Sequence, residues 1–205
     1  METFKQYFYE KNPSGGEGIT FIDVDETLFH TKAHVKVIKG NNVLKKLNNQ
    51  EFNTYVLEPG ERFDFSEFKD AEFFRKTSIP IEPVLKRVNR ILNNIERGGR
   101  KSKVVILTAR SRFDDMQEFK QTFRDYGVRI DDLEIITVGD VPGQAAEKKK
   151  EVVYNFLSNH PYKRVRMFDD SLANLKAFKS LEKQFPETKF FAIHVNNKGQ
   201  VYQLP

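Results

Sequence analysis

Short apolar runs alternate along the chain with longer stretches in which apolar residues recur every three or four positions. Five short runs are typical of buried strands, at residues 18–22, 103–108, 133–138, 165–168 and 190–193. Periodic stretches that predict amphipathic helices lie at 83–95, 113–126, 150–157 and 172–181. This alternation predicts an α/β fold in which a mostly parallel sheet lies between two helical layers.

Two weaker patterns lie at the ends of the chain. Residues 2–9 predict a short helix with Phe4 and Phe8 on one side. Residues 197–199 predict a turn that leads into an edge strand near 201–202. Both patterns would extend the α/β unit, and we expect residues 1–205 to form one domain.

Residues 31–80 do not follow the alternation of strands and helices. Residues 34–39 alternate like a strand, 40–42 predict a turn, and 52–57 predict a second strand before an aromatic stretch at 63–74. We interpret 31–80 as a β-rich flap or small cap inserted after the first strand. A connection of this length is expected to have a role, and here it would lie over the strand ends and gate a site.

The composition fits an ordinary globular domain. The chain has 205 residues, of which 39% are hydrophobic, and its nineteen Phe and absent Trp make Phe the large core side chain. It contains no Cys, which excludes disulfides, thiolate metal sites and cysteine nucleophiles. No run of eighteen apolar residues is present, and the N-terminus lacks the apolar region of a signal peptide. We therefore expect a cytoplasmic protein with no membrane segment.

Reactive residues gather where three of the expected strands end. Asp23 and Asp25 follow the first strand, Thr108 ends the second, and Asp169 and Asp170 end the fourth. The carboxyl ends of parallel strands meet at one edge of a sheet, where ligands bind in open α/β folds. Neighbouring carboxylates repel one another, and a hard divalent cation is the simplest group that offsets this repulsion.

Four motifs stand in order along the chain. The first is Asp-Val-Asp-Glu-Thr at residues 23–27, and the second is Thr108 after a buried strand. The third is a lysine near a helix start, among residues 148–150. The fourth is Asp-Asp-Ser at 169–171, with Asn174 one helical turn later. Each motif alone is weak, but four in sequence, each after the expected element, are a strong signal.

This order resembles the haloacid-dehalogenase-like (HAD) phosphohydrolase superfamily over roughly residues 17–195, with 31–80 unmatched. The resemblance implies a three-layer Rossmann-like fold and a phosphatase that works through an aspartyl-phosphate. Asp23 would be the nucleophile, and Asp25 would act as general acid and then general base. The second aspartate marks the family's phosphatases and argues for hydrolysis over dehalogenation.

The resemblance also implies groups that contact the phosphate. Thr108 would donate a hydrogen bond to a phosphoryl oxygen, and a lysine would offset the charge that develops during transfer. Among the three lysines we favour Lys150 as the catalytic, substrate-binding residue, because Val153 and Leu157 place it near the helix start. Lys148 stays open as an alternative.

Mg²⁺ is the cofactor that the resemblance implies. Asp23 and Asp170 would bind it through their carboxylates, and Asp25 through its backbone carbonyl. Asp169 would orient the lysine or a metal-bound water, and Asn174 would support the metal waters.

A second, narrower resemblance bears on the substrate. Residues 150–170 resemble the corresponding part of the 3'-phosphatase domain of bacteriophage polynucleotide kinase-phosphatase. Arg110 matches an arginine that this family uses near the phosphate, and would bind substrate by a bidentate contact. No kinase P-loop is present in the chain. We expect a nucleic-acid terminal 3'-phosphate or a nucleotide as the substrate.

The net charge of +5 leaves alternatives open. The basic residues of the insert could follow a nucleic-acid backbone, with Tyr55 or Phe63 stacking on bases, or could form a solvated surface. They are Lys32, Lys36, Lys39, Lys45, Lys46 and Arg62. The alternative functions are a phosphatase of small metabolites such as sugar phosphates, and a non-catalytic HAD-like domain that binds nucleic acid or a protein partner.

Overall fold

A six-stranded sheet forms the centre of the molecule. The structure is a computed structural model and describes residues 18–97 and 102–205, so the expected helix at 2–9 lies outside the described residues. The strands are β1 (Gly18–Ile22), β7 (Lys103–Thr108), β8 (Glu134–Thr137), β9 (Arg164–Asp169), β10 (Lys189–Val195) and β11 (Val201–Gln203). Their spatial order is β11-β10-β9-β1-β7-β8, and only β11 runs antiparallel to its neighbour. The expected α/β class with a mostly parallel sheet is confirmed.

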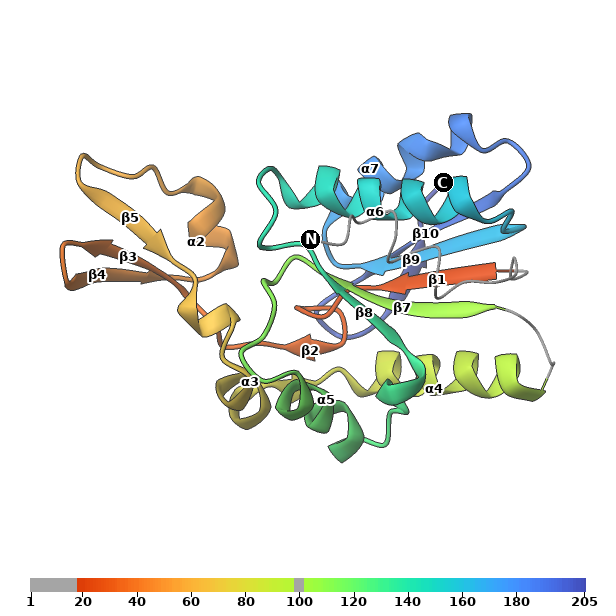
Figure 1. The fold of residues 1–205 in the computed structure, drawn as a ribbon, viewed down its shortest axis with the longest axis horizontal. Coiled ribbons are helices and arrows are strands. Elements are labelled where there is room, and N and C mark those ends of the chain that lie inside the picture. The colour runs from red at the N-terminus through yellow and green to blue at the C-terminus, as the bar shows by residue number, and fades with distance from the viewer. Residues whose placement is uncertain (1–17, 98–101) are drawn as a thin grey trace.

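Helices cover both faces of this sheet (Figure 1). One face carries α3 (Ala71–Thr77), α4 (Glu82–Arg97) and α5 (Met116–Asp125), and the other carries α6 (Ala145–Asn159) and α7 (Leu172–Lys179). Two short 3₁₀ segments, Ile130–Asp132 and Ser180–Gln184, follow α5 and α7. Within β1, Ile19 and Phe21 pack toward α6 and α7 while Ile22 packs toward α4, as the two-residue period of a strand requires.

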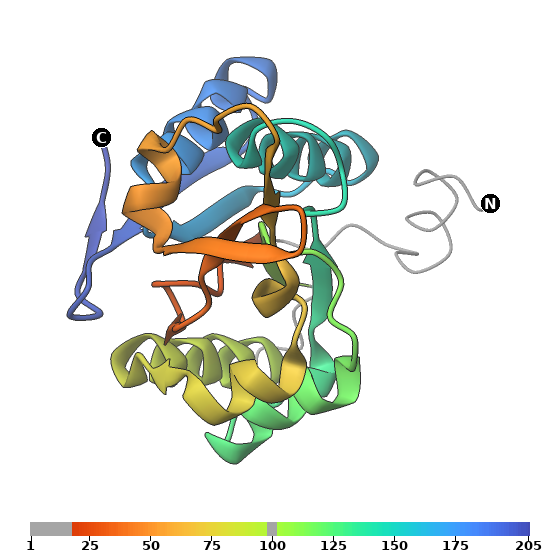
Figure 2. The ribbon, with the colours of Figure 1, turned by 90° about the vertical axis from the view of Figure 1, so that its left-hand side faces the viewer.

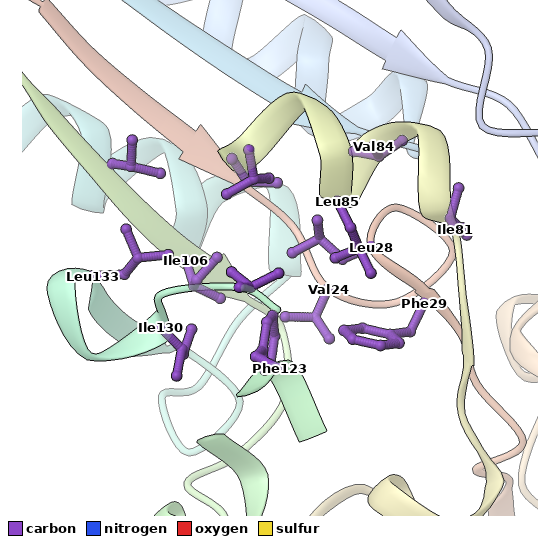
Figure 3. Close-up of a cluster of buried hydrophobic side chains, with 14 of the residues drawn as sticks. Val24, Leu28, Phe29, Ile81, Val84, Leu85, Ile106, Phe123, Ile130 and Leu133 are labelled. Atoms are coloured by element: carbon purple, nitrogen blue, oxygen red, sulfur yellow. The ribbon is translucent and has the colours of Figure 1, made fainter. Parts of the chain in front are cut away.

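The loop after β1 is anchored in the core on the α4 face. Figure 3 shows Val24, Leu28 and Phe29 beside Leu85 of α4 and Phe123 of α5, and all five belong to one buried cluster. Phe29 meets Phe123 edge to face, with ring centroids 5.1 Å apart. Burial of these side chains holds the backbone of the loop, and so holds the carboxylates that alternate with them in sequence.

Residues between β2 (Phe29–His30) and β6 (Ile79–Pro80) form a separate, smaller sheet. Its strands are β3 (Val35–Lys39), β4 (Asn42–Leu47) and β5 (Glu61–Asp64), antiparallel in the order β4-β3-β5. The chain leaves and returns at one place, because β2 and β6 pair with each other. Figure 1 shows the small sheet beyond the carboxyl ends of β1 and β9, and Figure 2 shows it in front of them.

The expected strand at 52–57 is wrong, because α2 (Asn49–Thr54) lies there instead. Asn48 and Glu51 form a reciprocal cap: the Asn48 side chain accepts from the Glu51 amide at 3.0 Å, and the Glu51 carboxylate accepts from the Asn48 amide at 2.8 Å. Phe52 and Tyr55, three positions apart, then pack together against the small sheet. The second and third strands of that sheet are β4 and β5, which the hydrophobic pattern did not indicate.

Two helices on the large sheet also begin at other residues than expected. α5 begins after Asp115, whose carboxylate accepts from the amides of Gln117 and Glu118, so Phe113 precedes the helix. α6 begins at Ala145, five residues before the expected start at 150.

Among residues 18–97 and 102–205, no helix combines the length and the apolar character needed to cross a bilayer.

Candidate active site

Three carboxylates converge at the carboxyl ends of β1 and β9. Asp23 directly follows β1, and its amide donates to the carbonyl of Phe168 at 3.0 Å, which extends the pairing of the two strands. Asp169 is the last residue of β9, and Asp170 follows it. One oxygen from each of Asp23, Asp169 and Asp170 lies within 4.8 Å of the others. The structure therefore brings together three of the expected site residues.

Lys149, and not Lys150, is the lysine in this cluster. Its Nζ lies 2.7 Å from Asp23 Oδ1 and 2.8 Å from Asp169 Oδ2, and the residue is only 1% exposed. The expectation that favoured Lys150 is corrected by this geometry: Lys150 is bonded to Glu147 at the surface. Lys148, the stated alternative, donates to the carbonyl of Val141.

The position of Lys149 follows from the periodicity of α6. Its buried residues are Lys149, Val152, Val153, Phe156 and Leu157, at the three- and four-residue steps of one helix face. Because the helix begins at Ala145, Lys149 lies in its second turn and faces the sheet. The signal was present in the sequence, since Lys149 precedes Val153 by four residues.

Asp169 is held by donors from the start of α7. Asn174 Nδ2 lies 2.9 Å and 3.1 Å from its two oxygens, and the Ser171 amide donates to Oδ1 at 2.9 Å. The Ser171 hydroxyl accepts from the Asn174 amide, as expected for a helix cap. His194 Nε2 lies 3.0 Å from the carbonyl oxygen of Asp170. Asn174 thus contacts the Asp169 carboxylate directly, whereas His194 contacts Asp170 only at its backbone.

The carboxylate of Asp25 lies outside this cluster and is bound by an arginine. Arg110 Nη2 lies 2.7 Å from Oδ1 and Arg110 Nε lies 2.9 Å from Oδ2, and the Thr31 hydroxyl donates to Oδ1 at 2.7 Å. The structure thus places the guanidinium of Arg110 against Asp25, and substrate binding by Arg110 stays a prediction. The backbone carbonyl of Asp25, to which the resemblance assigned metal binding, is a different atom and is not used by Arg110.

Aromatic side chains enclose the guanidinium of Arg110. Its Cζ lies 5.0 Å, 4.9 Å and 5.4 Å from the ring centroids of Phe68, Phe74 and Phe113. Its Nη1 also donates to the Phe68 carbonyl at 3.2 Å. Phe68 ends the short 3₁₀ segment Ser66–Phe68 on the return from the small sheet. Arg110 therefore connects this segment to Asp25.

Thr108 is fully buried at the end of β7. Its hydroxyl accepts from the amide of Arg110 at 3.1 Å. The loop after Thr108 lies very close to the loop after β8. A Cβ on Gly139 would lie only 2.3 Å from the Ser111 amide nitrogen. Only glycine fits at position 139 without moving the loop that carries Arg110.

Glu26 adopts a left-handed backbone conformation, with φ of 56°. Its carboxylate compensates through two local contacts, one to His30 Nδ1 at 2.7 Å and one from the Thr31 amide at 3.1 Å. These contacts fold the chain back between Asp25 and Thr31, whose side chains meet. Sequence reasoning did not identify Thr31 as part of the site.

The electrostatics of the cluster favour a bound cation. Burial, with Asp169, Asp170 and Asp25 adding like charge, raises the pKa of Asp23 well above its usual value despite the opposing effect of Lys149. Burial and the Asp169 charge raise the pKa of Asp170 to about 7. Burial acts to lower the pKa of Lys149, but Asp169 and Asp23 outweigh it, and the pKa is raised. Three carboxylates against one ammonium group form a donor set that fits a divalent ion.

Asp25 is in a different electrostatic state. Burial acts to raise its pKa, but the Arg110 charge and hydrogen bonds, with the Thr31 hydroxyl, outweigh it and hold the pKa below its usual value. Asp25 is therefore ionised at neutral pH. The site thus contains carboxylates in two environments. Asp23, Asp169 and Asp170 lie close to one another, whereas Asp25 is paired with a guanidinium.

Several basic side chains of the insert are bound within it. Lys36 and Lys46 both form ion pairs with Glu67. Lys45 Nζ lies 5.0 Å from the ring centroid of Tyr55, whose hydroxyl contacts Glu61. Phe63 packs between Phe52 and Tyr55 in the core of the small sheet. The two aromatic residues considered for base stacking are therefore engaged in the fold.

No protein-family model matches the chain, and no curated protein matches its sequence. The assignment of function is therefore based on the geometry and chemistry of the described residues.

Proposed function

We propose that the chain is an HAD-like phosphatase that hydrolyses a phosphomonoester with Mg²⁺ through an aspartyl-phosphate on Asp23. The observation that carries this proposal is the contact of Lys149 with both Asp23 and Asp169, beside Asp170, at the carboxyl edge of the sheet. A buried ammonium group between two carboxylates is costly to form. Its presence at the ligand-binding edge of an α/β sheet supports a catalytic use.

Asp23 is the nucleophile in this proposal. One of its oxygens attacks phosphorus and forms the mixed anhydride while the bond from phosphorus to the substrate oxygen breaks. A water oxygen then attacks the same phosphorus, which releases inorganic phosphate and restores the Asp23 carboxylate. The Phe168 carbonyl and Lys149 fix the backbone and the side chain of Asp23 during both steps.

Asp25 is the proton carrier. It donates a proton to the leaving alkoxide in the first step and takes one from the attacking water in the second. Because Arg110 lowers its pKa, the first step requires that substrate raise it again. A phosphoryl group nearby does so, since its negative charge favours the neutral carboxyl.

Lys149 and Thr108 stabilise the transferring group. The ammonium of Lys149 offsets the negative charge that develops on the phosphoryl oxygens, and the Thr108 hydroxyl donates to one of them. The Thr108 hydroxyl accepts from the Arg110 amide in the structure, so its own hydrogen is available for donation.

Asp23 and Asp170 would hold Mg²⁺ through their carboxylates, with Asp169 and Asn174 supporting them. When bound, Mg²⁺ supplies positive charge that keeps these carboxylates ionised and offsets the charge of the phosphoryl group. Residues 31–80 would act as the flap over this edge, since the paired strands β2 and β6 form its single connection to the large sheet.

The proposed substrate is a nucleic-acid 3'-phosphate or a nucleotide, supported by the basic insert. The ion pairs of Lys36 and Lys46 with Glu67, and the packing of Phe63, favour a second candidate, a small phosphorylated metabolite. Both candidates share the chemistry at Asp23 and differ only in what contacts the insert.

Hydrolysis of an aryl phosphate tests the activity. We expect Mg²⁺-dependent turnover that Asp23→Asn abolishes, while Asp132→Asn, an exposed aspartate, retains it. Equal, negligible turnover in the wild-type protein and Asp23→Asn would instead support a non-catalytic binding domain. A panel of 3'-phosphorylated oligonucleotides, nucleotides and sugar phosphates then assigns the substrate, and an oligonucleotide rate should fall steeply with salt.

A further inference from the structure

A cavity with several basic residues in its lining lies at the opposite end of the large sheet from the carboxylate cluster. It has a volume of about 140 Å³, and its lining includes Gly18 and Thr20 of β1, Arg164 and Arg166 of β9, Lys103 of β7 and Ile91 of α4. Gly18 pairs with Arg164, and Thr20 pairs with Arg166, so these four residues lie on one face of two adjacent strands. This face is apolar further along, where Ile22 and Phe168 contact the core.

The glycine at the start of β1 makes room for one of the arginines. A Cβ on Gly18 would lie 3.0 Å from both Cγ and Nε of Arg164. The Arg164 side chain therefore lies flat across the backbone of β1 rather than extending into solvent. Arg166 lies beside it, with Cζ 5.9 Å from the ring centroid of Phe191 on β10.

The two arginines have no carboxylate partner in the part of the chain that the structure describes. Within residues 18–97 and 102–205, no carboxylate forms an ion pair with Arg164 or Arg166. Burial and the neighbouring Arg164 lower the pKa of Arg166. Burial also lowers the pKa of Lys103, although Glu134 opposes the shift. Like charges that are partly removed from water without a counterion are unfavourable, unless an anion joins them.

The cavity is remote from the carboxylate cluster. Gly18 begins β1 and Asp23 follows its last residue, so five residues of extended chain, roughly 16 Å, separate the two sites. A volume of 140 Å³ holds roughly four water molecules or one phosphate group. A phosphate group presents several oxygen acceptors to two guanidinium groups. It therefore matches them better than a simple monovalent anion does.

We propose that this cavity is a second anion site, which binds the phosphate group of a small ligand between Arg164 and Arg166, with Lys103 and the Thr20 hydroxyl beside them. The ligand is either inorganic phosphate or a small phosphate ester, because both present the same dianion. The site does not depend on the proposed hydrolase activity, since it shares no residue with the carboxylate cluster.

Calorimetric titration in EDTA at constant ionic strength tests this site. Without a divalent cation the carboxylate cluster repels anions, so binding there does not mask the second site. Inorganic phosphate and ribose 5-phosphate are the two probes. We expect saturable binding to the wild-type protein and a loss of about tenfold or more in affinity for Arg166→Gln. Arg87→Gln, which removes the same charge from an exposed position of α4, should bind as the wild-type protein does.

The two probes separate the possible sources of the ligand. Binding of phosphate alone identifies the inorganic ion, and binding of both probes identifies a phosphate-carrying ligand. Saturable binding of neither probe to the wild-type protein overturns the proposal, and so does equal affinity of Arg166→Gln and the wild-type protein.

Two further measurements keep the test independent of how well Arg166→Gln folds. Gly18→Ala retains every charge but displaces Arg164, and we expect it to weaken binding as well. Crystals soaked with tungstate need no substitution and should show anomalous density between Arg164 and Arg166. Density confined to the carboxyl edge of the sheet would contradict the proposal.

Discussion

Arg110 binds Asp25 through two nitrogen atoms, with Nη2 at 2.7 Å from Oδ1 and Nε at 2.9 Å from Oδ2. The same guanidinium lies among three phenylalanine rings and donates to the Phe68 carbonyl. This pair thereby links the return segment of the insert to the residue that we propose as proton carrier. Removal of the Arg110–Asp25 pair should change the pH dependence of the proposed hydrolysis as well as its rate.

Arg110→Gln should lower kcat by about tenfold or more, because Asp25 loses the group that orients it. Arg110 lowers the pKa of Asp25, so its removal raises that pKa. The first step needs the neutral carboxyl of Asp25, and the alkaline limb of the kcat/KM profile should therefore move to higher pH. Arg112→Gln, at an exposed position two residues on, should leave the profile in place. A profile that keeps its limbs in Arg110→Gln would contradict the proposed role of Asp25.

Lys149→Met should destabilise the protein and abolish activity, whereas Lys150→Met should do neither. Loss of the buried ammonium group leaves Asp23 and Asp169 without their cation, at a cost of about 3–5 kcal/mol in the free energy of unfolding. The pair of Lys150 with Glu147 is at the surface and is worth less than about 1 kcal/mol. Urea denaturation and aryl phosphate turnover measure the two effects. The reverse ranking of the two variants would show that Lys149 is not the site lysine.

Asp170→Asn should stabilise the metal-free protein at pH 8 and remove most of the stabilisation by Mg²⁺. The folded protein raises the pKa of Asp170 to about 7 from the usual 3.8, so it binds more protons than the unfolded chain between these values. The contribution of Asp170 to stability therefore falls as pH rises from about 4 to 7. Mg²⁺ should raise Tm more at pH 8 than at pH 5, where it competes with the bound proton.

Thermal denaturation in EDTA and in Mg²⁺ checks the prediction for Asp170. Asp132→Asn, an exposed aspartate in the 3₁₀ segment after α5, serves as the control and should respond to Mg²⁺ as the wild-type protein does. An undiminished response to Mg²⁺ in Asp170→Asn would place the metal elsewhere.

Glu26→Ala should cost about 1–2 kcal/mol in the free energy of unfolding, and Glu26→Gly should cost less. Both changes remove the contacts with His30 and the Thr31 amide. Only glycine also relieves the strain of a φ of 56°. Chemical denaturation of the two variants measures the difference, and equal losses would show that backbone strain at Glu26 is negligible.

The sequence alone was sufficient to predict the α/β class and to place Asp23, Thr108, Asp169 and Asp170 at one edge of the sheet. The strands that carry Asp23, Thr108 and Asp169 are short buried runs, and their parallel pairing follows from the helices between them. Since the carboxyl ends of parallel strands share an edge, residues distant in sequence are placed together without knowledge of any contact. The turn at Gly40 and the hairpin at Val201–Gln203 also follow from local preferences.

Local pattern failed where a short segment fits two structures. Residues 52–57 were expected to form a strand, but the Asn48–Glu51 cap and the packing of Phe52 on the small sheet favour a helix over 49–54. Lys149 was missed because the helix was expected to begin at residue 150, which left Lys149 outside it despite its four-residue spacing from Val153. With α6 beginning at Ala145, Lys149 is helical and lies on the buried face with Val153, whereas Lys150 bonds with Glu147.

Which charged side chains pair with each other was decided by the tertiary structure alone. Asp25 and Arg110 lie in the loops after β1 and β7, and whether a buried arginine binds substrate or a neighbouring carboxylate depends on which anion the fold places within reach. The same holds for Arg164 and Arg166, whose alternation in β9 predicts only a shared face. Hydrophobic periodicity records which side of an element is buried, whereas the pairing of charges depends on distances between elements that the chain order does not encode.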